Sequence, residues 1–273
     1  MLPRESNMVN RPGLQLILLG ALFLLLIISE YFLPRRPFAL HRLPRAAVNL
    51  GLSALSNILL YLLLPLAALK TAYLAQAGGW GLLNLVPLSP AVSFAAAFLL
   101  LDLVIYFQHR MFHRLPLLWR LHRVHHVDEE LDVTSGVRFH PAEILLSMGI
   151  KLAAIALLGA APAAVAAFEL VLAATSLFNH SNISIPPRTD AFLRLFLVTP
   201  DFHRVHHSIE RDETDSNFGF NLPWSDMLLG TYRAQPRAGH LAMPLGLKEF
   251  RGQEWVSIPR LLTLPFIHPG EKR

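Results

Sequence analysis

Five apolar stretches decide what kind of fold this chain can adopt. They lie at Leu14–Leu33, Ala46–Leu69, Ala91–Phe107, 142–161 and 163–180. A helix of about 20 apolar residues crosses the hydrocarbon core of a bilayer, and each stretch approaches that length. Of the 273 residues, 53% are hydrophobic and only 16% are charged, which is too apolar for an ordinary soluble domain. We therefore expect an all-α, multi-pass integral membrane protein.

The last two apolar stretches are interrupted by Gly159 and Pro162, so they are expected to form a helical hairpin. Both are rich in alanine and marginal in length, and re-entrant helices that do not fully cross the bilayer would fit them equally well. The first stretch is longer than the apolar core of a signal peptide, and no small-residue cleavage site follows it. We expect it to be an uncleaved membrane anchor.

The arginines predict how these helices are oriented. Residues 34–45 form a short loop with four arginines, whereas residues 71–90 carry no charge at all. The positive-inside rule places the basic loop in the cytoplasm and the uncharged one on the opposite side. The net charge of +5 is spread beside apolar stretches rather than over one basic face, which indicates lipid headgroups and no nucleic acid. The composition favours a bacterial inner membrane.

A histidine motif occurs twice in the chain. His122-Arg-Val-His125-His126 returns as His203-Arg-Val-His206-His207. On a helix the offsets 0, +3 and +4 share one face, so each copy is expected to clamp a metal ion. Neutral imidazole is the commonest protein ligand for transition metals. Solvated or helix-capping histidines are the alternative, and they explain two matching copies poorly.

The number of imidazoles predicts two metal ions. A transition metal takes four to six ligands, and three clusters already supply eight imidazoles before His180 is added. An even number of membrane crossings between the two motifs would bring all of them to one side, as a cytoplasmic, His-rich di-metal cap. The expected ligands are His109, His113, His122, His125, His126, His180, His203, His206 and His207.

Three further residues are candidates for ligands or for groups that support ligands. His140 could be a ligand, a hydrogen-bond donor beside the site, or a histidine at the start of a helix. Asp102 shares a helical face with His109 and could accept a hydrogen bond from a ligating imidazole. The carboxylates of Asp201 and Asp128 could balance the positive charge of the metal ions. Alternatively, both could be ordinary solvated charges in loops, and we favour this interpretation for Asp128.

The order of these motifs resembles that of the fatty acid hydroxylase and sterol desaturase superfamily, which are membrane di-iron oxygenases. The resemblance runs from about Leu101 to Tyr232: HxxxH, HxxHH, an HP-x-E segment, a lone histidine in Asn-His-Ser-Asn, and a final HxxHH. It includes Asn217-Phe-Gly-Phe and the segment from Trp224 to Tyr232. Two positions depart from the family pattern: Ser176 stands where some hydroxylases have a further histidine, and Ser225 separates Trp224 from Asp226.

The resemblance implies an enzyme that hydroxylates or desaturates a C–H bond of a lipid, such as a sterol, a fatty acyl chain or a carotenoid. It implies that the nine histidines bind two iron ions, which zinc could replace in purified protein. Electrons would come from an external ferredoxin, cytochrome or reductase, because nothing in the chain is expected to carry flavin or haem. The lipid would enter sideways, between the third apolar stretch and the hairpin.

Three regions are expected along the chain: membrane spans in residues 1–90, a catalytic region in 91–235 and a cytoplasmic tail in 236–273. The main alternative function is a membrane metal transporter or metal-binding protein. Transporters hold their ligands near the bilayer midplane, often with carboxylates on broken helices. Most of the histidines lie beyond the ends of the apolar stretches, which favours the oxygenase. A zinc hydrolase would need a general-base glutamate in HExxH, and the chain has no such motif.

Overall fold

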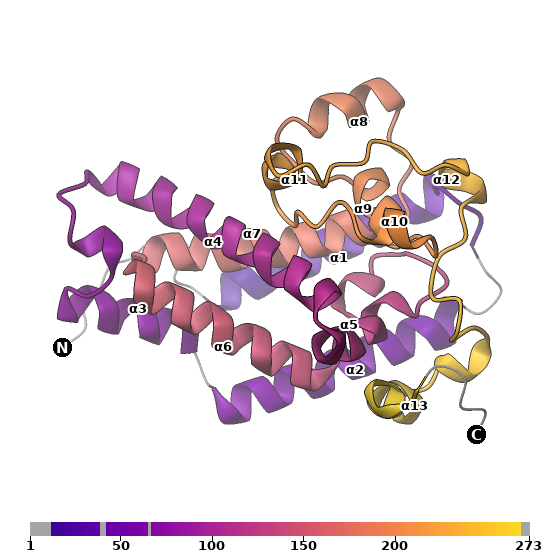
Figure 1. The fold of residues 1–273 in the computed structure, drawn as a ribbon, viewed down its shortest axis with the longest axis horizontal. Helices are drawn as coiled ribbons and strands as arrows, with labels where there is room; N and C mark the ends of the chain where they lie inside the picture. The colour runs from indigo at the N-terminus through magenta and orange to yellow at the C-terminus, as the bar shows by residue number, and fades with distance from the viewer. Residues whose placement is uncertain (1–11, 39–41, 65–66, 269–273) are drawn as a thin grey trace.

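A computed structural model describes residues 12–38, 42–64 and 67–268 of the chain (Figure 1). Within these ranges the fold is helical, with two isolated bridges, Pro34 to Ile183 and Ser208 to Leu245, in place of any β-strand. The helices in chain order are α1 Pro12–Phe32, α2 Arg42–Leu63, α3 Ala67–Gly78, α4 Pro90–Arg114, α5 Pro116–His126, α6 Pro141–Leu158, α7 Pro162–His180, α8 Pro187–Leu193, α9 Pro200–His206, α10 Arg211–Thr214, α11 Trp224–Leu228, α12 Gly239–Ala242 and α13 Ile258–Thr263. The all-α prediction is confirmed.

Five helical segments are long and apolar enough to cross a membrane, as the sequence predicted. They are Gly13–Phe32, Arg42–Asn84, Pro90–Arg114, Pro141–Leu158 and Pro162–His180. The expected second stretch differs in detail, because α2 ends at Leu63 and a separate helix, α3, follows it. Proline cannot continue a helix without losing a hydrogen bond, and Pro65 stands in the sequence between the two.

Prolines and one glycine fix where the helices begin and end. The helices from α4 to α9 all have proline in their first turn, where its missing N–H leaves no helical hydrogen bond unmade. Helix α6 ends at Gly159, which adopts the left-handed conformation at φ 66°. Pro162 then begins α7, so α6 and α7 form the predicted hairpin.

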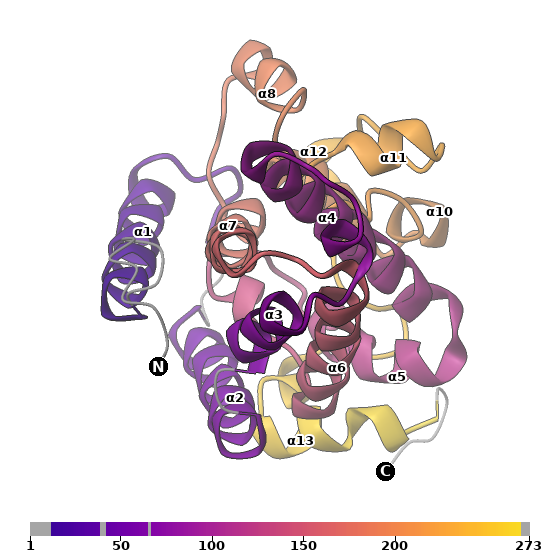
Figure 2. The same cartoon turned by 90° about the vertical axis from the view of Figure 1, so that its left-hand side faces the viewer.

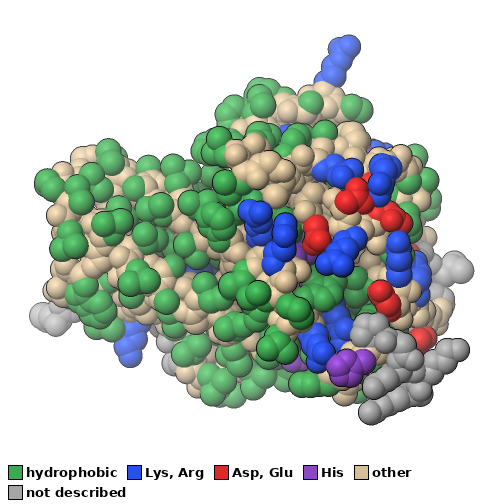
Figure 3. Space-filling model, in the orientation of Figure 1, with side chains coloured by type: hydrophobic (Ala, Val, Ile, Leu, Met, Phe, Trp, Pro, Cys, Tyr) green, Lys and Arg blue, Asp and Glu red, His purple; other side chains and the backbone are tan. Residues whose placement is uncertain are grey.

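The molecule divides into an apolar bundle and a charged end. Figure 2 shows α7 inside the bundle with α1, α3, α4 and α6 around it. Alanine, leucine and phenylalanine side chains from α3, α4, α6 and α7 build its core. In Figure 3 hydrophobic side chains dominate one half of the visible face, and charged side chains gather on the other. Large apolar side chains such as Leu24, Ile58 and Leu157 are exposed on the bundle, as expected beside lipid.

The charged end is a cap made by α5 and α8 to α13 with their loops. The basic loop lies at this end, since Arg35 pairs with Asp201 at 3.0 Å and Arg45 pairs with Asp128 at 2.8 Å. The expected loop is shorter than predicted, because Arg42 and Arg45 already belong to α2, and Arg35 and Arg45 contact protein carboxylates. The loop and the histidine motifs share one end of the molecule, as predicted, and the cytoplasmic placement of that end stays a prediction.

The described part of the expected C-terminal tail is packed into the cap. Phe250, Leu261 and Leu264 share an apolar cluster with Leu52 of α2 and Val124 of α5. The buried Arg123 guanidinium donates hydrogen bonds to the carbonyls of Leu264 and Ile267. The division into three regions stays a prediction, while the apolar clusters join parts of all three.

Candidate metal centre

Nine histidines that are distant in the sequence meet at the junction of bundle and cap. They come from the end of α4, from α5, from the last residue of α7, and from α9 with the residue after it. All nine are buried. Their candidate ligand atoms form two groups, within each of which the atoms lie no more than 4.8 Å apart. The five-His group is His109, His113, His122, His126 and His206, and the four-His group is His125, His180, His203 and His207.

Each HxxHH motif contributes to both groups. In α5, His122 and His126 belong to the five-His group and His125 to the four-His group. In the second motif the division is reversed, because His203 and His207 join the four-His group and His206 the other. Our expectation that each copy clamps one metal was therefore wrong. Residues i and i+4 lie close together on a helix, whereas i+3 and i+4 point about 100° apart and can serve different ions.

Hydrogen bonds fix the tautomers of two rings in the five-His group. His109 Nδ1 donates to the carbonyl of Phe218 at 2.8 Å, and His122 Nδ1 donates to Glu143 Oε1 at 2.6 Å. Each neutral ring then presents a bare lone pair on Nε2, yet these two Nε2 atoms lie 3.1 Å apart. Two lone pairs at that distance repel each other unless a cation lies between them. Metal–nitrogen bonds of about 2.1 Å at a right angle separate two nitrogens by about 3.0 Å.

The four-His group repeats this arrangement. His125 Nδ1 donates to the carbonyl of Arg138 at 3.0 Å, and His180 Nδ1 donates to the carbonyl of Ser176 at 2.7 Å. Their Nε2 atoms are 3.1 Å apart, and His203 Nε2 lies 3.0 Å from that of His180. The four-His group therefore has the same excess of facing lone pairs.

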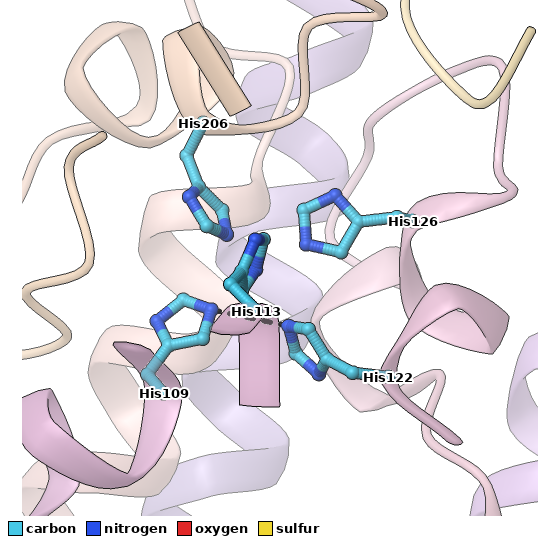
Figure 4. Close-up of side chains that lie close together, drawn as sticks. All are labelled: His109, His113, His122, His126 and His206. Atoms are coloured by element: carbon cyan, nitrogen blue, oxygen red, sulfur yellow. Dashed lines mark hydrogen bonds between the residues drawn. The ribbon is translucent and has the colours of Figure 1, made fainter. Parts of the chain in front are cut away.

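Several ring nitrogens are buried without a hydrogen-bond partner among the described residues. They include both nitrogens of His113 and of His126, and Nε2 of His206. Unpaired buried polar atoms are costly, so their clustering in one place indicates that a ligand satisfies them. The residues fit metal ions, and Figure 4 shows the five rings of the larger group converging.

Burial keeps His125, His126, His203 and His206 neutral, which is the form of imidazole that binds metal. Burial, with the neighbouring imidazoles adding to it, holds the pKa of His125, His126 and His203 well below its usual range. Burial lowers the pKa of His206 to about 3, against a hydrogen bond to the carbonyl of Ser216 that raises it. At neutral pH no proton has to leave before these rings bind a metal ion.

The three supporting candidates lie in neither His group. His140 caps the start of α6, because its Nδ1 accepts a hydrogen bond from Ala142 N at 3.1 Å, which is the helix-start role that the sequence allowed. Asp102 is buried and interacts with Asn221 and Leu222. The N–H group at Nδ1 of His109 donates its hydrogen bond to a backbone carbonyl instead. The hydrogen bond expected from a ligating histidine to Asp102 is absent from the contacts of the described residues.

Asp201, in the first turn of α9, and Asp128, just after α5, are paired inside the protein. Asp201 pairs with Arg35 and Arg204, and Asp128 pairs with Arg45 and Arg138. Asp128 is 3% exposed, so the solvated interpretation was wrong for it. Through these ion pairs, both carboxylates connect segments of the cap that are distant in the sequence.

Sequence reasoning missed a carboxylate that hydrogen-bonds to a ligand candidate. Glu143 is 4% exposed in the first turn of α6, and it accepts the hydrogen bond from His122. A carboxylate behind an imidazole fixes its tautomer and raises its basicity. The available signal was the HP-x-E segment, in which Glu143 stands three residues after His140.

A second missed residue organises the loop behind His109. The carboxylate of Asp226 accepts hydrogen bonds from Phe218 N at 2.9 Å, Gly219 N at 2.6 Å and Thr231 Oγ1 at 2.6 Å. Burial raises the pKa of Asp226, although these hydrogen bonds oppose the shift. Asn217 precedes the loop in the left-handed region at φ 52°. The loop thereby points the carbonyl of Phe218 at His109.

A cavity of about 320 Å³ reaches the metal centre from within the bundle. Residues of α2, α4, α6 and α7 line it, and at one end it meets His109, His122 and His125. It lies between α4 and the hairpin, where sideways entry of a lipid was expected. Ser176 also lines the cavity, and its hydroxyl donates a hydrogen bond to the carbonyl of Gly136 at 2.6 Å.

Comparison with known proteins agrees with the family resemblance of the histidine motifs. The family model of fatty acid hydroxylase matches residues 94–231, about half of the chain. The chain is 33% identical over 168 residues to ornithine lipid hydroxylase OlsE of Rhizobium tropici, covering 62% of this chain and 48% of that protein. It is 30% identical over 168 residues to alkylglycerol monooxygenase of Homo sapiens, covering 60% of this chain and 36% of that protein.

A more distant relative is the very-long-chain aldehyde decarbonylase GL1-1 of Oryza sativa subsp. indica. It is 31% identical over 139 residues, covering 48% of this chain and 22% of that protein. The chain thus spans less than half the length of each of these three curated relatives. No solved structure matches it.

Proposed function

The chain belongs to the fatty acid hydroxylase family, and from this premise we propose that it is a membrane-embedded lipid oxygenase that uses dioxygen. The observation that carries the proposal is the pair of histidine groups with facing Nε2 lone pairs at 3.1 Å, at the end of a cavity inside the bundle. A metal transporter would place such ligands on a path across the membrane. A cavity that lies inside the bundle and is lined by histidines of both groups fits a substrate that is held there.

The reaction that we propose is the hydroxylation of a lipid C–H bond. One C–H bond and the O–O bond break, one oxygen atom enters the lipid as an alcohol, and the other leaves as water. For the reaction to balance, two electrons and two protons must be supplied by an external donor and by solvent. Desaturation would take the same inputs and give an alkene and two waters. The relatives named hydroxylase and monooxygenase favour hydroxylation.

Two iron ions bound by the nine histidines would supply the dioxygen chemistry, and zinc could replace them in purified protein. The five-His group would hold one ion and the four-His group the other. Other residues of the chain orient the imidazoles and line the cavity beside them. Glu143 and the carbonyl of Phe218 hold two imidazoles in the tautomer that binds metal. Phe139 stacks on His125 with ring centroids 4.4 Å apart, and Phe220 also lines the cavity.

We place the entry of electrons at a second cavity, of about 430 Å³, on the cap. It reaches His113 and Trp119, and the Trp119 ring centroid lies 5.0 Å from that of His113. Three cationic side chains, of Arg114, Arg211 and Lys248, line it and outnumber the two carboxylates, of Asp215 and Glu249. An external ferredoxin, cytochrome or reductase with an acidic surface would fit there. With the basic loop inside, this face would be cytoplasmic in a bacterial inner membrane.

The test is metal analysis of the full chain, purified anaerobically from cells grown on iron-57. We expect about two irons per chain, with a Mössbauer signal of coupled ions, and incorporation of oxygen-18 from labelled dioxygen into a lipid alcohol. Variants His125→Ala and His206→Ala remove one histidine from each group and serve as controls. One ion or none in iron-replete protein, or metal uptake without labelled lipid, would contradict the proposal.

A further inference from the structure

A charge pair lies near the middle of two helices that are apolar enough to span a membrane. Lys151 of α6 and Glu169 of α7 form an ion pair, with Nζ 2.7 Å from Oε1. Lys151 is 9% exposed, and the side chain of Glu169 is 32% exposed. Ionisable side chains inside membrane spans are rare and indicate function. Neither residue contacts the metal groups in the described structure, so the proposed chemistry leaves this pair unexplained.

The pair lines the cavity that leads to the metal centre. Gln108 lines it as well, donating a hydrogen bond to Ser147 Oγ at 3.1 Å. The Oε1 atom of Gln108 is buried and has no hydrogen-bond partner among the described residues. One part of the cavity wall is therefore polar, whereas Ile105 and other side chains make the rest apolar.

Stability alone is a weak reason for this arrangement. Moving two charged groups out of water costs about as much free energy as their mutual attraction provides. An ion pair inside a protein therefore often stabilises the fold no better than apolar side chains would. The hairpin of α6 and α7 is already fixed at its turn by Gly159 and Pro162. A pair that lines a cavity can, in addition, hydrogen-bond to whatever enters.

On the basis of the proposed function, we propose that Lys151, Glu169 and Gln108 bind a neutral polar group of the lipid substrate, such as a hydroxyl. The two charges cancel, so a group without net charge fits best. Lys151 can donate to it, and the carboxylate of Glu169 or Oε1 of Gln108 can accept from it. These contacts fix which carbon of the lipid lies beside the metal centre.

The helix gives the distance to that carbon. Lys151 stands eight residues after Glu143, which contacts His122. At the rise of an α-helix, eight residues span about 12 Å. An extended chain advances about 1.2 Å per bond. We take this separation of the two Cα atoms along α6 as the working distance from the polar group to the metal centre, which places the reacting carbon about ten bonds from the polar group.

The first test maps a bound probe on the full chain in lipid nanodiscs. Hexadecan-1-ol would carry a photoreactive diazirine either next to the hydroxyl or about ten bonds from it. We expect the first probe to label peptides around Lys151 and Glu169, and the second to label peptides around Phe139 and Phe220. The opposite pattern, or the same peptides from both probes, would overturn the proposal.

The second test measures selectivity for the hydroxyl. The double variant Lys151→Met/Glu169→Leu removes both charges. The double variant Asp190→Leu/Arg194→Met removes an ion pair with the same 2.7 Å separation that is more deeply buried, and it is the control. Hydrogen bonds to charged groups are strong, so we expect the labelling ratio of hexadecanol to hexadecane probes to fall about tenfold in the first variant only. An unchanged ratio, with both variants folded, would show that the pair has only a structural role.

Neither test needs iron, dioxygen or turnover. The proposed function could thus fail in the metal analysis while hydroxyl selectivity persists, or the reverse, and the two failures are distinguishable. If the double variant does not fold, the labelling pattern of the wild-type chain decides the proposal on its own.

Discussion

Replacement of Glu143 tests how the protein holds its metal centre. The carboxylate lies 2.6 Å from His122 Nδ1 and is buried. Glu143→Gln keeps an oxygen that can accept the same hydrogen bond but loses the negative charge behind the imidazole. Glu143→Ala loses both, so the His122 ring can rotate and can bind a proton on either nitrogen. The alanine variant should therefore be the more damaged of the two.

The size of the effect follows from the role of such contacts. Loss of a group that orients a ligating histidine weakens metal binding by about 10 to 100-fold. That factor corresponds to about 1.4 to 2.7 kcal/mol of binding free energy. We place Glu143→Gln near the lower value and Glu143→Ala near the upper one. The assay is iron retained by the purified chain at graded concentrations of a competing chelator.

A matched variant separates this effect from general damage. Asp190→Asn changes another buried carboxylate, which pairs with Arg194, and it should leave iron retention unchanged. Thermal unfolding of all three variants in detergent controls for stability. Wild-type iron retention in both Glu143 variants would refute the reasoning, because it would mean that His122 needs no partner to bind metal.

Three further outcomes are expected. His125→Ala and His206→Ala should each abolish lipid oxidation and lower the iron content to well below two per chain, with expression largely intact. Asp226→Asn replaces an acceptor of three hydrogen bonds, and it should lower the free energy of unfolding by about 3 kcal/mol, measured by thermal unfolding in detergent. Arg45→Met removes the arginine shared by the buried carboxylates of Asp128 and Asp132 and should destabilise the chain by about 3 to 5 kcal/mol in the same assay, whereas Arg211→Met at an exposed position should have little effect. Near-equal unfolding temperatures for these last two variants would contradict the buried-pair argument.

Local patterns in the sequence predicted much of this structure. Runs of apolar residues predicted the membrane helices, and Gly159 with Pro162 predicted the hairpin, because both signals act within one helix or turn. The nine ligand candidates were also predicted, since imidazoles at spacings of three and four are visible without a fold.

The division of the histidines could not be predicted, because it depends on how α5 packs near α9. His125 and His126 are neighbours in the chain, yet they join different groups. Glu143 was missed for a similar reason, since its partner His122 stands on another helix. The arginines of the basic loop predicted which end they occupy, but their pairing with Asp128 and Asp201 depends on long-range packing.

The histidine doublets have a consequence for how the centre assembles. A single turn of α5 carries ligands for both groups, and so does the end of α9. When one ion binds and orders that turn of helix, the neighbouring imidazole is therefore also positioned to bind the second ion. The entropy lost in ordering the turn is shared between two binding events. We accordingly expect iron to load cooperatively, with chains that hold two ions or none outnumbering those that hold one.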